Sequence, residues 1–261
     1  MNHSFYTGDN VEVLKQHVED ESVDLTVTSP PYDDLRTYNG FEWDIDGVIE
    51  QLWRVTKRGG VVVWVVGDKT HNGSETGTSF RTALKFMEYG WRLHDTMIYA
   101  KKTVYAHDPR NKRYKQAFEY MFIFSKGSPK TYNEIKDRPN KNAGKVLSGT
   151  KGRDKEGRKR KIKPIVIGDF QARYNIWEYA TGKSSTTDDV AFLHPAVFPE
   201  QLAADHIISW SNENDTVLDL FGGSGTVTKM AELNNRNSIY IDISEEYTEL
   251  AKERLSMYEE V

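Results

Sequence analysis

The chain has 261 residues, 38% hydrophobic and 12% aromatic, and this supply of apolar side chains excludes a wholly disordered protein. The longest apolar run, Val61 to Val66, is far shorter than the roughly 18 residues that cross a bilayer. The N-terminus has no basic region followed by an apolar stretch, as a secretory signal would. These features predict one cytoplasmic α/β domain with no membrane partner.

Cysteine is absent from the chain, which removes several kinds of chemistry. Disulfides, thiolate zinc sites, cysteine-ligated iron–sulfur clusters and a cysteine nucleophile are all excluded. The seven histidines are scattered without the paired spacing of metal ligands, so no metal site is predicted.

Positive charge is concentrated between Lys126 and Arg173. This segment holds fifteen Lys and Arg residues against five Asp and Glu residues. The rest of the chain holds 20 Lys and Arg residues against 34 Asp and Glu residues. Such an asymmetry favours a phosphate-rich partner, although a solvated lysine-rich loop would have the same composition. Because the segment has few large apolar residues, we expect a long, mobile insertion with little core of its own.

Strands and helices alternate on both sides of this insertion. The expected strands are 23–28, 61–66, 92–100, 118–125, 216–220 and 238–242. The expected helices are one starting at Ile45 with Asp44 as its cap and closed by residues 57–60, one around 80–87, and those at 199–210, 226–234 and 245–257. This alternation predicts a largely parallel sheet with helices on both faces.

The first candidate site is Thr28-Ser29-Pro30-Pro31-Tyr32, at the end of the strand 23–28. Ligands bind at the carboxyl ends of strands in an open α/β sheet. Two prolines hold the backbone extended and offer no N–H, so the loop presents a hydroxyl, carbonyl oxygens and an aromatic ring. These groups suit an amine on a flat ring, and an ordinary Pro-Pro turn is the structural alternative.

The second candidate site is the sequence VLDLFGGSGT, residues 217–226, where a strand runs into a glycine turn and a helix. The glycines allow a ligand to approach the backbone closely, and Asp242, twenty residues after Gly222, can accept hydrogen bonds from ribose hydroxyls. Thr228 stands where a dinucleotide fingerprint has its third glycine. The motif therefore favours a nucleoside-type cofactor over a pyrophosphate.

In combination, TSPPY followed by LDLFGGSGT resembles the amino-group DNA methyltransferases that use S-adenosylmethionine. The catalytic motif comes first, a variable region follows and the cofactor motif comes last, as in the circularly permuted beta group. Segments 6–14, 173–177 and 194–200 also resemble that group. The resemblance implies a Rossmann-like methyltransferase fold with a mostly parallel twisted sheet. It also implies a single domain over residues 1–261, in which the basic insertion 126–173 contributes to recognition of the DNA target.

The resemblance also implies roles for the motif residues. Ser29 and the carbonyl of Pro30 would accept hydrogen bonds from the target amine, Pro31 completes the catalytic motif, and Tyr32 would stack on a base flipped from the duplex. The implied S-adenosylmethionine-binding residues are Asp9, His194, Phe198, Asp219, Phe221, Gly222, Gly223, Gly225, Thr226 and Asp242. Asp9 would face the adenine, Asp242 the ribose, and His194 and Phe198 the methionine end. For Asp9 and His194, the alternative is a purely structural role in a turn or at a helix cap.

Tyr240 and the basic residues near position 160 also bear on the resemblance. Tyr240 departs from the family pattern, because many relatives have glycine at this position before the acidic residue. Phosphate contacts are expected from the basic residues Arg158, Lys159, Arg160, Lys161 and Lys163.

The target base follows partly from composition. Methylation of the cytosine ring carbon needs a cysteine nucleophile in the known enzymes, so cytosine N4 and adenine N6 remain. The serine before Pro-Pro resembles the N4-cytosine enzymes more than the aspartate form of the N6-adenine enzymes. We therefore favour cytosine N4, with adenine N6 as the alternative.

Other function classes give weaker interpretations. An NAD-dependent dehydrogenase would leave Pro-Pro-Tyr unexplained, and the permutation and basic insertion argue against RNA or a protein glutamine as substrate. A DNA-binding module without catalysis does not fit the intact motifs. The expected partner is double-stranded DNA, while a homodimer and a cognate restriction enzyme stay open. The expected source is a bacterium, an archaeon or a phage.

Overall fold

The computed structural model describes residues 1–31, 44–104, 112–194 and 197–258. It divides the chain into two compact units, one made of Met1–Asn133 with Asn175–Val261 and the other of Glu134–Tyr174. The second unit, here called the ribbon unit, covers most of the basic segment but begins at Glu134 rather than at Lys126 and ends at Tyr174. Among the described residues, no helix is both long and apolar enough to span a bilayer.

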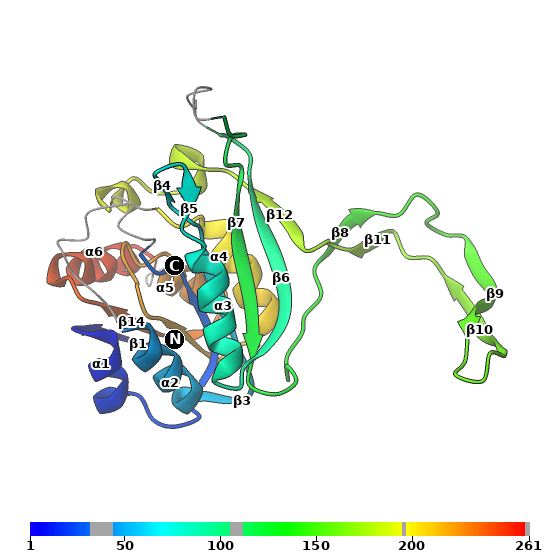
Figure 1. The fold of residues 1–261 in the computed structure, drawn as a ribbon, viewed down its shortest axis with the longest axis horizontal. Coiled ribbons are helices and arrows are strands. Elements are labelled where there is room, and N and C mark those ends of the chain that lie inside the picture. The colour runs from blue at the N-terminus through cyan, green and yellow to red at the C-terminus, as the bar shows by residue number, and fades with distance from the viewer. Residues whose placement is uncertain (32–43, 105–111, 195–196, 259–261) are drawn as a thin grey trace. The chain divides into compact units, whose positions relative to one another are not determined.

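An eight-stranded sheet forms the centre of the first unit, in the order β1-β14-β13-β2-β3-β7-β6-β12 (Figure 1). Its strands are β1 (His3–Thr7), β2 (Val23–Thr28), β3 (Thr56–Val66), β6 (Arg92–Lys101), β7 (Phe118–Ser125), β12 (Ile176–Tyr179), β13 (Thr216–Asp219) and β14 (Asn237–Asp242). Strand β7 is antiparallel to both of its neighbours, and the other pairs in this sheet are parallel. The predicted mostly parallel sheet is confirmed.

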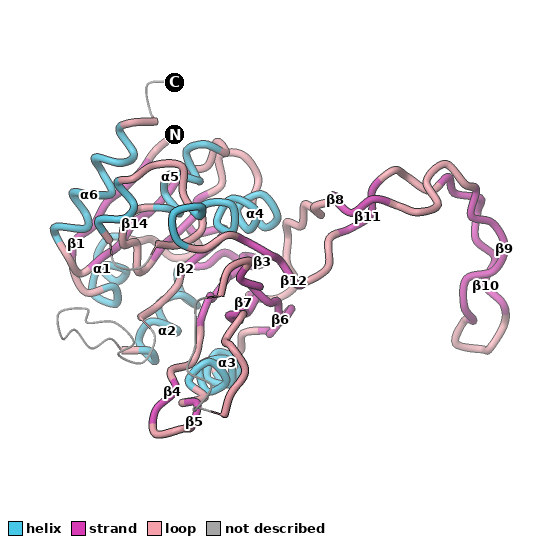
Figure 2. The backbone as a smooth tube through the Cα atoms, turned by 90° about the horizontal axis from the view of Figure 1, so that it is seen from above, coloured by secondary structure: helices cyan, strands magenta, loops and turns pink. Residues whose placement is uncertain are grey.

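Helices cover both faces of this sheet. They are α1 (Asn10–His17), α2 (Ile45–Val55), α3 (Thr78–Glu88), α4 (Glu200–Trp210), α5 (Thr226–Leu233) and α6 (Glu245–Ser256). Helix α2 packs against both α1 and α3, whereas α5 packs against both α4 and α6. Figure 2 shows α2 and α3 on one side of the strands and α4 and α5 on the other. Because both faces are covered, every residue from Val61 to Val66 is buried, as expected for a central strand.

The predicted end of the helix before β3 is wrong. Helix α2 ends at Val55, and β3 begins at once with Thr56, opposite Val23. The register then shifts before the next pair, Leu25 with Val61. Residues 57–60 therefore lie in an irregular strand start, where Gly59 has φ +83°, and do not cap a helix.

Two short elements of the sheet have weak sequence signals. Strand β1 was indicated only by the family resemblance, and the helix α1 that follows it was not predicted. Strand β12 directly follows the basic segment and alternates exposed Ile176 and Glu178 with buried Trp177 and Tyr179. The Tyr179 hydroxyl donates to the Asp205 carboxylate at 2.6 Å, which fastens this edge strand to α4.

The ribbon unit consists of two antiparallel strand pairs. Strand β8 (Lys136–Pro139) pairs with β11 (Phe170–Ala172), and β9 (Val146–Arg153) pairs with β10 (Lys159–Val166). Its larger apolar side chains are mostly exposed, including Val166 at 65% and Phe170 at 55%. The expectation of little core therefore fits, and strand pairing, which the sequence analysis did not predict, gives the backbone its hydrogen bonds without a buried core. A hairpin of β4 (Thr70–His71) and β5 (Ser74–Glu75) lies in the first unit.

Candidate active site

The two sequence motifs meet where the order of the sheet reverses. Strands β13 and β2 are parallel neighbours, although nearly 200 residues separate them, and the chain leaves them toward opposite edges of the sheet. Such a switch point opens a crevice for ligands at the carboxyl ends of the strands. The Thr28 hydroxyl at the end of β2 donates to Oδ1 of Asp219 at the end of β13, at 2.7 Å. This buried bond ties the Ser-Pro-Pro loop to the glycine turn.

Asp219 is the central polar residue of this junction. Its Oδ1 also accepts a hydrogen bond from the backbone N–H of Phe221 at 3.2 Å, which fixes the backbone where the chain leaves β13 for the glycine turn. Burial raises the pKa of Asp219 to about 7 and the charge of Asp242 adds to the rise, while the hydrogen bonds from Thr28 and Phe221 oppose it. The contacts of Asp219 therefore position the two loops, and its predicted contact with a cofactor stays a prediction.

The glycine turn is packed tightly from below by Tyr240. A Cβ added to Gly222 would lie 2.1 Å from the Tyr240 ring, so a side chain at position 222 would collide with it. The Tyr240 hydroxyl donates to the Gly223 carbonyl oxygen at 2.8 Å. Tyr240, which departs from the family pattern, is thus fully buried and braces the turn from within the sheet. Gly223 and Gly225 have φ of +49° and +73°, values that favour glycine.

Asp242 lies beside this turn at the end of β14. Its Oδ2 accepts from the Gly223 N–H at 2.8 Å, and its Oδ1 accepts from the Ser244 N–H at 2.9 Å. Burial raises the pKa of Asp242, whereas these backbone donors and the nearby His194 lower it. Each carboxylate oxygen keeps capacity for a second hydrogen bond, so two hydroxyls could bind here.

His194 reaches the same place from the segment before α4. The His194 ring lies against Gly223, where an added Cβ would come within 3.1 Å of Cε1 and Nε2, and it meets the Tyr247 ring edge-on at 4.4 Å. The structure thus brings together three of the predicted cofactor-binding residues, His194, Gly223 and Asp242, and their contact with a cofactor stays a prediction. Phe198, also predicted to bind the cofactor, is half-buried just before α4.

Asp9 lies at the same edge of the sheet. Strand β1 ends with Thr7 opposite Asp242, and the Gly8 N–H donates to the Asp242 carbonyl oxygen at 2.9 Å. The Asp9 side chain caps α1 by accepting from the Glu12 N–H at 3.0 Å. The capping alternative therefore holds for one oxygen of Asp9, and its contact with adenine stays a prediction.

The catalytic motif follows β2 directly. Ser29 and Pro31 are half-buried and Pro30 is buried, at the end of the strand that Asp219 holds. Tyr32 lies outside the described residues. The structure therefore places Ser29, Pro30 and Pro31 directly after β2, the neighbour of β13, and leaves the role of Tyr32 a prediction.

A buried ionic cluster behind the turn escaped the sequence analysis. The Lys229 amine, from α5, lies 2.7 Å from both Asp188 and Glu200, and the Arg254 guanidinium, from α6, lies 3.0 Å from Asp188 and 2.6 Å from Glu200. Burial opposes ionisation, but Lys229 and Arg254 hold the pKa of Asp188 below its ordinary range. Lys229 and the hydroxyls of Thr186 and Thr187 do the same for the pKa of Glu200. Arg254 also donates to the Ser224 carbonyl oxygen at 2.9 Å, so the cluster supports the turn.

This cluster had one usable sequence signal. Arg254 falls on the apolar stripe of α6 beside Leu250, Ala251 and Leu255, where a charge has to be buried and therefore paired. Its partners at positions 188 and 200 come from other segments and could not be named from α6 alone.

The predicted DNA-contacting residues all lie in the ribbon unit. Lys159 and Lys163 are exposed on β10, and Arg160 and Lys161 belong to the same strand. Arg158 is in the turn before it, where its guanidinium lies 3.2 Å from Asp154 and 3.1 Å from Glu156. Part of the charge of Arg158 is therefore already balanced within the turn.

Comparison with known sequences agrees with this geometry. A DNA methylase family, that of the N6 and N4 methyltransferases, matches residues 23–253. The chain is 56% identical over 249 residues to the orphan methyltransferase M.BamHII of Bacillus amyloliquefaciens, covering 94% of this chain and 93% of the relative. It is 28% identical over 263 residues to the type II methyltransferase M.BglII of Bacillus subtilis, and the match covers 96% of this chain and 68% of that relative.

Solved structures share the fold. The PvuII DNA methyltransferase (cytosine-N4-specific) superposes with a TM-score of 0.71 at 20% identity, covering 97% of this chain and 86% of that one. The M1.HpyAVI–SAM complex superposes with a TM-score of 0.62 at 21% identity, and the match covers 97% of this chain and 100% of that one. With its sheet order, its two joined motifs and a family match over most of its length, this chain belongs to the DNA methylase family of S-adenosylmethionine-dependent N6 and N4 amino-methyltransferases.

Proposed function

We propose that the protein transfers a methyl group from S-adenosylmethionine to the N4 amine of a cytosine flipped out of duplex DNA. The observation that carries this proposal is the buried bond from Thr28 to Asp219, because it joins the loop suited to an amine with the turn suited to a nucleoside. Membership of the DNA methylase family decides against the NAD-dependent dehydrogenase and against RNA or protein glutamine as the substrate.

The residues around the glycine turn fit S-adenosylmethionine. Because Gly222, Gly223 and Gly225 have no side chains, Tyr240, His194 and Ala251 pack directly against the turn and fix the backbone that a cofactor would approach. Asp242 holds a carboxylate oriented by two backbone donors beside the turn, which suits the two ribose hydroxyls. When bound, S-adenosylmethionine supplies a methyl group on a positively charged sulfur.

The catalytic loop would act on the amine by position. The Ser29 hydroxyl and the Pro30 carbonyl oxygen would accept hydrogen bonds from the two N–H groups of the amine, which turns the nitrogen lone pair out of conjugation with the ring and toward the methyl group. As the bond from nitrogen to the methyl carbon forms, the bond from that carbon to sulfur breaks, and the amine releases one proton. No covalent enzyme intermediate is needed, and much of the rate comes from holding the reacting atoms in line. Tyr32 stacks on the flipped base in this proposal.

Two observations support cytosine N4 over adenine N6. Ser29 occupies the position before Pro-Pro, as in the N4-cytosine enzymes that the motif resembles. The PvuII enzyme, whose fold this chain shares, is named as cytosine-N4-specific. Adenine N6 is the alternative. A homodimer and a cognate restriction enzyme stay predictions from the resemblance.

Analysis of the modified nucleosides tests the proposal. Purified protein is incubated with methyl-labelled S-adenosylmethionine and unmodified duplex DNA, which is then digested and separated by chromatography with mass detection. We expect label in N4-methyldeoxycytidine. Label in N6-methyldeoxyadenosine would overturn the choice of base, and label in RNA or protein but not in DNA would overturn the substrate.

A further inference from the structure

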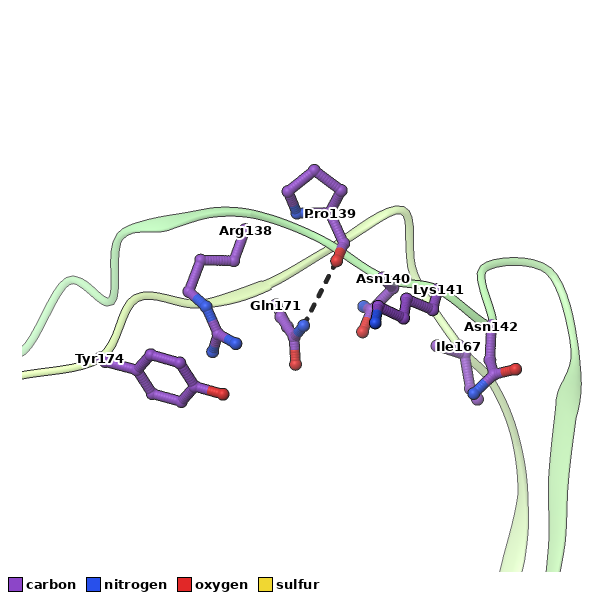
Figure 3. A pocket seen from close by; sticks show the side chains of 8 residues that line it. All are labelled: Arg138, Pro139, Asn140, Lys141, Asn142, Ile167, Gln171 and Tyr174. Atoms are coloured by element: carbon purple, nitrogen blue, oxygen red, sulfur yellow. Dashed lines mark hydrogen bonds between the residues drawn. The ribbon is translucent and has the colours of Figure 1, made fainter.

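The ribbon unit has an open pocket of about 570 Å³ beside the β8–β11 pair (Figure 3). Arg138 and Gln171, from opposite strands of this pair, project into it together with Tyr174. Nothing in the proposed methyl transfer uses these residues. Their hydrogen bonds show what the pocket could bind.

Arg138 is held in one orientation. Its guanidinium carbon lies 3.2 Å from the centre of the Tyr174 ring, and its Nη1 donates to the Ala172 carbonyl oxygen at 3.1 Å. The neighbouring acid, Asp137, pairs with Arg173 at 2.5 Å and so does not neutralise Arg138. Among the described contacts only Nη1 is used, which leaves donors on Nε and Nη2 for a ligand.

Gln171 presents an acceptor next to these donors. Its Nε2 donates to the Pro139 carbonyl oxygen at 3.3 Å, the dashed line in Figure 3, and this bond fixes which end of the amide faces the backbone. The Oε1 atom therefore faces the pocket as an acceptor. The figure shows the Gln171 amide and the Arg138 guanidinium next to each other.

A phosphate is a poor match for this pair. Phosphate oxygens only accept hydrogen bonds, so the Gln171 Oε1 would face them without a donor. A G·C base pair presents two acceptors, N7 and O6 of guanine, next to the N4 donor of cytosine in the major groove. Arg138 with two free donors and Gln171 with one acceptor complement that pattern.

We propose that Arg138 and Gln171 read the major-groove edge of one G·C base pair in the target site. This proposal rests on the proposed DNA methylation and adds the residues that specify sequence. The exposed lysines of β10 would contact phosphates and position the duplex, whereas the pocket would distinguish one base pair from the others. A two-stranded ribbon is narrow enough to enter the major groove.

The test compares variants that keep and remove charge. DNA from cells expressing the wild-type protein is sequenced with detection of modified bases to find the methylated motif. Methylation rates, as kcat/KM, are then measured on a synthetic duplex with that motif and on duplexes with each base pair changed in turn. The variants are Arg138→Lys, which keeps the charge but loses the paired N–H donors of the guanidinium, and Gln171→Ala. Lys163→Gln is the control on β10.

We expect the preference for G·C at one position of the motif to fall about 10- to 100-fold in Arg138→Lys and in Gln171→Ala. The salt dependence of DNA binding should stay as in the wild type. Lys163→Gln should keep the motif and lower the log–log salt slope by about 0.9.

Unchanged preferences at every position in both variants would overturn the proposal, as would uniform weakening of all sites with a smaller salt slope. These results differ from a failure of the proposed function, in which the wild-type protein would methylate no DNA.

Discussion

Asp242 illustrates how one residue serves both the fold and the proposed cofactor. Its carboxylate accepts from the Gly223 and Ser244 N–H groups, and the proposed ribose hydroxyls would take its remaining lone pairs. We expect Asp242→Ala to weaken binding of S-adenosylmethionine by about 1.5–3 kcal/mol, the scale of a hydrogen bond to a charged group. Titration calorimetry measures this, with Asp242→Asn as the milder control. Wild-type affinity in the alanine variant, or heat with NAD but none with S-adenosylmethionine, would contradict the assignment.

Asp219 predicts a pH dependence of stability. Burial raises its pKa to about 7 in the folded state, above the ordinary value near 4 of an unfolded chain. Between those values the folded state binds more protons, so the contribution of Asp219 to the free energy of unfolding is greatest at low pH and is lost as the pH rises through 7.

Asp219→Asn should remove this dependence, because an amide oxygen can still accept from Thr28 and Phe221 but does not ionise. The difference in urea midpoint between the variant and the wild-type protein should grow in favour of the variant from pH 5 to pH 8. A constant difference over that range would show that Asp219 keeps the same ionisation in both states.

At the scale of elements, the glycine turn and β14 form one packed unit. Because Gly222 leaves no room for a Cβ above Tyr240, Gly222→Ala should cost about 1–3 kcal/mol of stability and weaken cofactor binding. The same substitution should cost much less when Tyr240 is already alanine, since the ring it strikes is gone. Urea unfolding of the two single variants and the double variant gives the coupling between the sites. Additive costs would rule out the collision.

The buried ionic cluster makes a second prediction at this scale. Arg254→Met would remove one of the two cations that pair with Asp188 and Glu200, so we expect the free energy of unfolding to fall by about 3–5 kcal/mol. Lys252→Ala on the same helix breaks only an exposed pair with Glu249 and should cost about 0.5 kcal/mol or less. Chemical unfolding compares them, and similar losses would mean that the cluster does not stabilise the turn segment.

The elements with strong local patterns were predictable from sequence, and those that depend on partners were not. Buried β-branched runs marked β2 and β3, and the Asp44 cap of α2 is present, with Asp44 accepting from the Asp46 N–H. The start of β3 at Thr56 depends on its pairing with Val23, which no local pattern shows. In the site, the structure brings the glycine turn and Asp242, which the motifs singled out, to the same edge of the sheet, and their cofactor contacts stay predictions. The contact of Tyr240 with this turn depends on the packing of β14, which no local pattern shows.

At the scale of the whole molecule, the basic charge lies on a unit with its own strand pairing. Replacing Arg158, Lys159, Arg160, Lys161 and Lys163 with Gln should weaken DNA binding and flatten its salt dependence, by about 0.9 in slope per lost phosphate contact. Because Arg158 already pairs with Asp154 and Glu156, we expect the loss to correspond to fewer than five contacts. Affinity for S-adenosylmethionine should hardly change. An unchanged slope would make the basic run a solvated surface.

We propose that motifs from opposite ends of the chain form one active site, in which Ser29 acts on the amine and the glycine turn holds the methyl donor. The most direct measurement is the single-turnover rate of methyl transfer by Ser29→Ala at saturating DNA and S-adenosylmethionine. We expect a rate about 100-fold or more below the wild-type rate, the scale of removing one preorganised hydrogen-bond partner, with both binding affinities nearly unchanged. A wild-type rate in Ser29→Ala would contradict it and leave the Pro-Pro loop a structural turn.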